Sequence, residues 1–168
     1  ENRFYLVCAA FVETRLTDYL KQRQDGADVS IAVLSTQWSA LALQGPKSRD
    51  VLAACTPAPL DNANFKWLSA QQIEIAGHPV WAMRLSYAGE LGWEIHGPAA
   101  SMLAIYDALW AAGESHGVMD YGSFAMNALR MEKMFKGAGE LTNEVTLPEA
   151  DVMRFVKLDK EFVGKEAT

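Results

Sequence analysis

Apolar and polar positions recur with two different periods along the chain, and these periods predict both helices and strands. Helical spacing of apolar residues indicates helices over 11–24, 47–54, 99–112 and 121–135. Alternating or continuous apolar runs indicate strands at 4–9, 28–34, 40–43, 71–75, 80–85 and 91–96, and residues 151–162 predict a helical turn followed by a strand. Most connections between successive strands are too short for parallel crossovers. The sequence therefore predicts an α+β fold with largely antiparallel sheets and packed helices.

The chain reads as one region over 1–168, without repeats or low-complexity segments. Residues 56–64 carry two prolines and two asparagines and are expected to form a loop. A division into two lobes, if there is one, would fall near 55–65. The chain opens without Met on a strand-like run and ends on Gly164-Lys165-Glu166-Ala167-Thr168, so we expect it to be a piece of a longer protein.

Composition narrows the classes of partner. The formal net charge of −6 argues against a nucleic-acid partner, which would require a basic face. We expect no membrane segment, because no apolar run reaches the roughly 18 residues that a spanning helix needs. Cys8 and Cys55 belong to no paired motif, and we expect them to be reduced, buried thiols of a cytoplasmic protein.

Several common kinds of site are missing from the sequence. His78, His96 and His116 are scattered and form no metal-binding motif, so we predict no metal site and interpret each histidine as a surface or turn residue. Gly137-Ala138-Gly139 follows a predicted helix and lacks the third glycine of a dinucleotide-binding loop. We interpret it as a helix terminator.

The predicted hairpin from Arg84 to His96 is the best candidate for a binding site. Alternation along its second strand places three residues on each face: Glu90, Gly92 and Glu94 on one, Leu91, Trp93 and Ile95 on the other. Two carboxylates with a glycine between them leave room for a flat ligand against the backbone. Tyr87, across the turn, could stack on that ligand or hydrogen-bond with it. The pattern alone favours a simpler interpretation, a hairpin with one solvated acidic face.

Four segments in order resemble one family. Residues 87–95, Tyr-Ala-Gly-Glu-Leu-Gly-Trp-Glu-Ile, resemble the hairpin signature of the glycine-cleavage T-protein (aminomethyltransferase) family, and 41–46, 128–133 and 162–165 resemble further segments of it. Within the family, Leu-Gly-Trp-Glu, Arg-Met-Glu-Lys and Leu-Pro-Glu-Ala look most like the C-terminal half of dimethylglycine and sarcosine dehydrogenases. The resemblance implies a T-protein-like folate-binding fold, incomplete at both ends, with an upstream part and a C-terminal barrel domain outside the chain.

The resemblance also implies a tetrahydrofolate site. The family glutamate that binds the pterin ring corresponds to Glu94, and a carboxylate can accept both the 2-amino and N3–H groups of a pterin. Tyr87 and Tyr5 correspond to family tyrosines near the folate, whereas Glu90 is interpreted as a turn residue that closes the hairpin.

Two departures from the family limit what the chain is expected to do alone. The family's catalytic aspartate would fall upstream of Glu1, so no catalytic residue is predicted within the chain. Met126 stands where T-proteins carry an arginine near the folate tail, as is common in the dehydrogenase-like branch. We interpret Arg130 as a structural partner of Glu132 or of a loop carbonyl.

The expected function is a fragment of a tetrahydrofolate-dependent one-carbon transferase module. It would act on N-methyl amines such as dimethylglycine or sarcosine, or on glycine-derived aminomethyl groups, with FAD in an upstream domain of the parent enzyme. The isolated fragment is expected to be inactive. Two alternatives stay open: a non-catalytic folate-binding or assembly module, and a folate-dependent demethylase of a sulfonium compound. The sequence does not indicate an oligomeric state.

Overall fold

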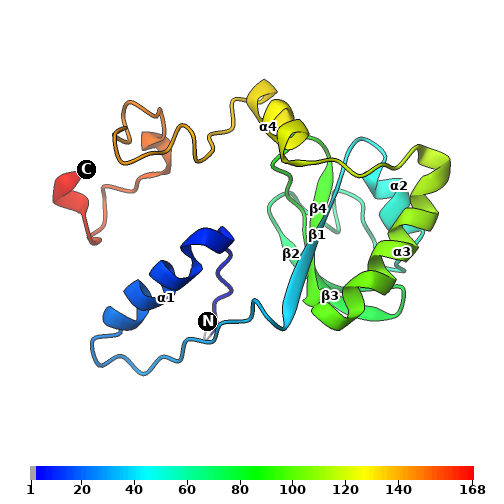
Figure 1. The fold of residues 1–168 in the computed structure, drawn as a ribbon, viewed down its shortest axis with the longest axis horizontal. Helices are drawn as coiled ribbons and strands as arrows, with labels where there is room; N and C mark the ends of the chain where they lie inside the picture. Colours follow the sequence, from blue (N-terminus) through cyan, green and yellow to red (C-terminus); the bar gives the residue numbers. More distant parts are fainter. Residues whose placement is uncertain (1–2) are drawn as a thin grey trace.

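The computed structural model describes residues 3–168 (Figure 1). The elements in chain order are η1 (Ala10–Val12), α1 (Glu13–Gln22), β1 (Trp38–Gln44), α2 (Ser48–Ala53), β2 (Ala70–Ile75), β3 (His78–Met83), β4 (Gly92–Pro98), η2 (Ala99–Ser101), α3 (Met102–Gly113), η3 (Glu114–His116), α4 (Ser123–Glu132), η4 (Met153–Phe155) and η5 (Lys165–Ala167). The four predicted helices are all present, each within a few residues of its expected bounds.

The four strands form one sheet in the order β1-β4-β3-β2, and every neighbouring pair is antiparallel. β2 and β3 are joined by Ala76 and Gly77, whose φ angles of 51° and 79° are those of a two-residue type I′ turn. β3 and β4 are joined by the longer segment 84–91, in which Gly89 has a φ of 76°. An antiparallel sheet with packed helices confirms the predicted α+β fold.

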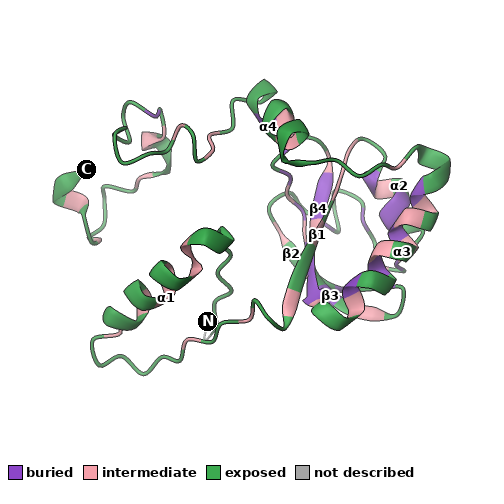
Figure 2. Ribbon diagram, in the orientation of Figure 1, coloured by how far each residue is buried: buried purple, intermediate pink, exposed green. Residues whose placement is uncertain are grey.

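The core lies between one face of this sheet and the helices α2 and α3 (Figure 2). Ile73, Val80 and Ile95 of the sheet are buried against apolar residues of both helices. Trp93 is fully buried, and its ring meets that of Phe65 edge-on at 6.1 Å between centroids. The predicted alternation in β4 is thus confirmed, because Trp93 and Ile95 face the core while Glu94 faces away.

The core includes residues from the loop between α2 and β2. Leu60 and Phe65 are both buried and pack with side chains from α2, α3 and the sheet. The place near 55–65 suggested for a division into lobes therefore does not coincide with a break in this core.

Three predicted strands are wrong. Residues 4–9 and 28–34 form no strand, and none follows the helical turn η4 within 151–162. A strand is stabilised by pairing with a neighbour and by burying one face. Phe4 and Val29 remain exposed and the segments around them pair with no strand of the described chain.

The N-terminal helix and the last thirty residues contribute little to the core. α1 has no buried residue, and Figure 1 shows it and the C-terminal segment (orange to red) lying apart from the sheet. Cys8 is exposed, which contradicts the expected buried thiol, whereas Cys55 is half-buried and both cysteines are free. Within residues 3–168, no helix is long and apolar enough to cross a membrane.

Candidate functional site

The face of the sheet opposite α2 and α3 carries Glu94. Direct cross-strand pairing places Glu94 between Ala42 of β1 and Met83 of β3, and His96 between Ala40 and Trp81. The Glu94 side chain is 30% exposed. Its carboxylate is therefore held on a sheet strand and remains reachable from solvent.

His96 links Tyr5 to Glu94, although the sequence did not indicate a role for this histidine. His96 Nε2 lies 3.3 Å from Glu94 Oε2, and His96 Nδ1 lies 3.1 Å from the Tyr5 hydroxyl. His96 is only 3% exposed, so its interpretation as a surface or turn residue is wrong. Its position two residues after Glu94, on the same face of a predicted strand, was the available signal.

Tyr5 lies over this face although its own segment forms no strand. Its ring meets His96 edge-on at 5.7 Å between centroids and is tilted against Trp38 at 6.1 Å. Partial burial raises the pKa of the Tyr5 hydroxyl above its ordinary value of 10.0. The hydroxyl is therefore neutral at physiological pH and available as a hydrogen-bond donor.

The expected space beside Gly92 is already filled. A Cβ at this position would lie 2.8 Å from the Leu43 carbonyl oxygen and 2.9 Å from Gln44 Cγ. Gly92 pairs directly with Gln44. The glycine therefore permits the close approach of β1 to β4, and the proposed room for a flat ligand against its backbone is wrong.

Tyr87 contacts the loop after α4. Its hydroxyl donates to the Lys136 carbonyl at 2.7 Å, and its ring stacks on Phe135 with 6.2 Å between centroids and 16° between planes. These contacts hold the β3–β4 connection against that loop. They leave the Tyr87 side chain partly exposed, at 38%.

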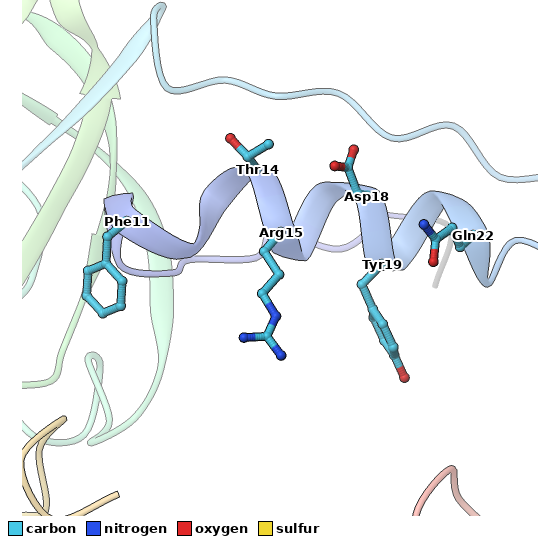
Figure 3. Close-up of a pocket in the computed structure, with 6 residues that line it drawn as sticks. All are labelled: Phe11, Thr14, Arg15, Asp18, Tyr19 and Gln22. Atoms are coloured by element: carbon cyan, nitrogen blue, oxygen red, sulfur yellow. The ribbon is translucent and has the colours of Figure 1, made fainter. Parts of the chain in front are cut away.

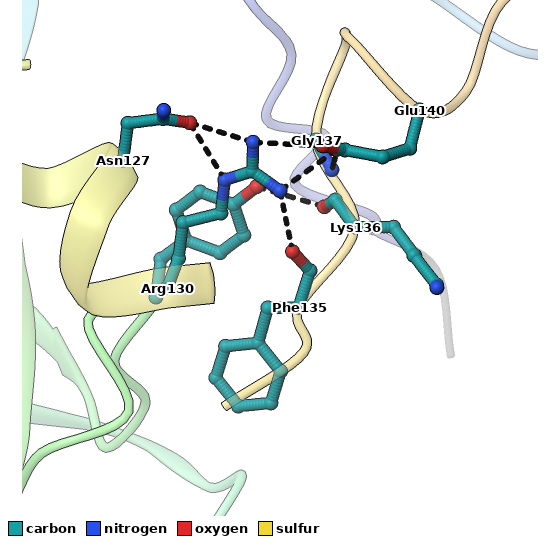
Figure 4. A network of polar contacts seen from close by, with 7 residues as sticks. Asn127, Arg130, Phe135, Lys136, Gly137 and Glu140 are labelled. Carbon is teal, nitrogen blue, oxygen red and sulfur yellow. Dashed lines mark hydrogen bonds and ion pairs between the residues drawn. The ribbon is translucent and has the colours of Figure 1, made fainter. Parts of the chain in front are cut away.

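The loop itself is organised by the buried guanidinium of Arg130 (Figure 4). Arg130 donates to both carboxylate oxygens of Glu140, at 2.8 and 3.1 Å, and to the Phe135 carbonyl at 2.8 Å. It also donates twice to Asn127 Oδ1. The structural role predicted for Arg130 is confirmed for the loop carbonyl, but its acidic partner is Glu140 rather than Glu132.

The Arg130–Glu140 pair changes the ionisation of both groups. Hydrogen bonds from Arg130, followed by one from the Gly137 N–H, lower the pKa of the Glu140 carboxyl below its ordinary value of 4.5. The hydrogen bond to Glu140 likewise raises the pKa of Arg130. Gly137-Ala138-Gly139 lies in the loop closed by the Gly137–Glu140 hydrogen bond, after α4 has already ended at Glu132, so its interpretation as a helix terminator is wrong.

The sequence patterns also did not predict a hydrogen bond between Tyr121 and Gln44, at the end of β1. The Tyr121 hydroxyl donates to Gln44 Oε1 at 2.7 Å, joining the segment before α4 to the strand that pairs with β4. Burial raises the pKa of Tyr121. On α4 itself, Met126 is half-buried.

A surface hollow lies elsewhere, along α1 (Figure 3). It has a volume of about 590 Å³ and is lined by Phe11, Thr14, Arg15, Asp18, Tyr19 and Gln22. All six residues come from η1 and α1, so the hollow has a single wall and contains none of the predicted ligand residues. Among the described residues, no group of three or more His, Cys, Asp or Glu side chains could hold a metal ion.

Comparison with known proteins identifies the class of domain. The family described as "GCVT N-terminal domain" matches residues 1–160. The chain therefore belongs to this family, as the four ordered segments predicted.

Individual relatives are enzymes of N-methyl amine oxidation by name. Human mitochondrial dimethylglycine dehydrogenase is 41% identical over 145 residues, which is 84% of this chain and 17% of that protein. Mouse mitochondrial sarcosine dehydrogenase is 41% identical over 130 residues, 76% of this chain and 14% of that protein. The chain thus spans about a sixth of the length of these relatives.

A solved structure supports the fold. The heterotetrameric sarcosine oxidase from Corynebacterium sp. U-96, in complex with pyrrole 2-carboxylate, has a TM-score of 0.54 and 26% identity, and the match covers 64% of this chain and 54% of that one.

Proposed function

We propose that this chain is the folate-binding part of a tetrahydrofolate-dependent one-carbon transferase module, and that Glu94 binds the pterin end of the folate. Its membership of the GCVT N-terminal domain family supports the class of ligand. The observation that carries the site is the position of Glu94, a partly exposed carboxylate fixed on β4 and facing away from the core.

The chemistry of Glu94 fits a pterin. The ring presents two adjacent donors, and an ionised carboxylate accepts through both oxygens. Glu94 Oε2 already accepts from His96, while Oε1 takes no hydrogen bond from the other described residues. Tyr87 and Tyr5 are proposed to flank the ligand with their rings, since both hydroxyls already take part in hydrogen bonds within the protein.

The parent reaction is proposed to be the transfer of a one-carbon unit from an N-methyl amine. Relatives named for dimethylglycine and sarcosine favour this substrate class over a sulfonium compound. Bound folate would supply the nitrogen that accepts the one-carbon unit. The residues of this chain would bind and orient it, which is a large part of catalysis when a reactive fragment must meet its acceptor before water does.

The oxidation step is assigned to a part of the parent enzyme outside this chain. A dehydrogenase or oxidase needs an electron acceptor, and the proposed one is FAD in an upstream domain. A cytoplasmic location stays a prediction, and two of the relatives described above are mitochondrial. The catalytic aspartate expected upstream of Glu1 is the feature that would separate an enzyme from a non-catalytic folate-binding module.

Isothermal titration of the chain with 5-formyl-tetrahydrofolate tests the site. Glu94→Ala removes two charge-assisted hydrogen bonds, and we expect binding to weaken by about ten- to a hundredfold. Glu90→Ala is the matched control, because Glu90 is an exposed residue of the β3–β4 connection; its affinity should equal that of the wild type. Equal binding by the wild type and Glu94→Ala would refute the assignment.

A further inference from the structure

His96 connects Tyr5 and Glu94, two residues expected at the folate site, through hydrogen bonds to both. No sequence motif had assigned His96 to that site. We infer that His96 is a positioning residue: it holds the Glu94 carboxylate through Nε2 and is itself held through Nδ1 by the Tyr5 hydroxyl. The inference rests on the proposed function, since it concerns the same carboxylate.

The direction of the hydrogen bonds follows from the groups involved. An ionised carboxylate only accepts, so the proton between His96 and Glu94 must be carried by Nε2. In the neutral imidazole, Nδ1 is then an acceptor, and the neutral Tyr5 hydroxyl donates to it. Both ring nitrogens are thus satisfied inside a side chain that is almost completely buried.

This arrangement fixes Glu94 without consuming its capacity to bind a ligand. Each carboxylate oxygen has two lone pairs, so Oε2 can accept from His96 and from a ligand at the same time. A free glutamate side chain would have to be ordered when the ligand binds. Ordering it in advance removes part of that cost from the binding equilibrium.

Packing fixes the imidazole in turn. The Tyr5 ring lies edge-on against it, and Tyr5 comes from a segment 91 residues earlier in the chain. Segment 3–9 therefore has a role at the site although it forms no strand. Tyr5 contributes its hydroxyl to His96 and can offer a ligand only its ring.

Substitution of His96 by Gln or by Asn tests separately its hydrogen bonds to Glu94 and to Tyr5. In His96→Gln the side-chain amide reaches about as far as Nε2 and can still donate to Glu94. In His96→Asn it reaches only as far as Nδ1, so it keeps a partner for Tyr5 but loses Glu94. His116→Asn, on exposed η3, is the control for a histidine substitution elsewhere.

Titration of the 168-residue chain with 5-formyl-tetrahydrofolate should show His96→Gln within about threefold of the wild type and His96→Asn up to about tenfold weaker, the effect of having to order one free side chain when the ligand binds. His116→Asn should match the wild type. Equal affinities for the Gln and Asn variants would overturn the inference.

Imidazole ¹⁵N chemical shifts of the wild-type chain give a readout that does not depend on any variant folding. At about pH 8, where imidazole is ordinarily neutral, His96 should be in the Nε2–H form. An Nδ1–H form would overturn the inference about His96 even if folate binds. Absence of binding by the wild type would instead overturn the proposed function.

Discussion

Replacing Gly92 with alanine tests how closely β1 and β4 must approach at the site. The added Cβ would lie 2.8 Å from the Leu43 carbonyl oxygen and 2.9 Å from Gln44 Cγ. A real Cβ does not approach a backbone oxygen this closely, and the oxygen cannot swing aside as the end of a side chain would. The β1 backbone must therefore shift at the Gln44–Gly92 pair.

The expected cost follows from two opposing effects. Overpacking of a well-packed site costs about 1–3 kcal/mol. Replacing glycine with alanine also reduces the freedom of the unfolded chain, which stabilises the fold by about 0.4–1 kcal/mol. Because the clash is with a backbone oxygen, the overpacking cost should lie in the upper half of its range, about 2–3 kcal/mol. We therefore expect Gly92→Ala to lower the free energy of unfolding by about 1–2 kcal/mol.

Urea unfolding monitored by tryptophan fluorescence measures this loss. Trp93, next to the substituted residue, is fully buried and becomes exposed on unfolding. With a denaturant slope of about 2 kcal/mol per M, the midpoint should fall by about 0.5–1 M.

Gly139→Ala is the matched control for the effect on the unfolded chain. No heavy atom lies within 4 Å of its added Cβ, and its φ is not left-handed, so its midpoint should be unchanged or slightly higher. An unchanged or higher midpoint for Gly92→Ala would refute the close-approach argument.

Three further predictions concern the loop after α4. Arg130→Met removes the donor that joins Asn127, Phe135 and Glu140, so amide hydrogens of residues 135–140 should exchange roughly tenfold faster, while those of β2 and β3 are unchanged. Because the folded-state pKa of Glu140 is depressed, its contribution to stability is present above about pH 4.5 and is lost as the pH falls through the folded value. Glu140→Gln should therefore lose less stability than the wild type between about pH 6 and pH 3, and an equal loss in urea titrations would contradict this. Tyr87→Phe removes the hydrogen bond to the Lys136 carbonyl and keeps the stack on Phe135. It should therefore lower the free energy of unfolding, measured from the urea midpoint, by about 0.5–1 kcal/mol. A loss above about 2 kcal/mol would contradict the prediction that the hydroxyl contributes a single hydrogen bond.

Local patterns in the sequence predicted the sheet and the orientation of Glu94. Short connections allow only antiparallel neighbours, and period-two alternation separates Trp93 and Ile95 from Glu94 regardless of what else the chain does. By contrast, residues 4–9 and 28–34 have the composition of strands but find no partner. Strand propensity reflects the surroundings that the fold provides more than an intrinsic preference of the backbone.

Long-range contacts were the part that local patterns could not supply. His96 is buried on the sheet, and Tyr5, far away in the chain, packs against it. Arg130 bonds to Glu140 because the intervening loop returns toward α4, whereas spacing along the helix suggested Glu132. In both cases the residue type indicated a hydrogen-bonding need, and only the fold identifies the partner.

The crystal structure of the chain bound to 5-formyl-tetrahydrofolate tests the central claim most directly. The pterin 2-amino and N3 nitrogens should lie within about 3 Å of the Glu94 carboxylate oxygens, with His96 still hydrogen-bonded to Oε2. A pterin bound along α1, or anywhere out of reach of Glu94, would contradict it.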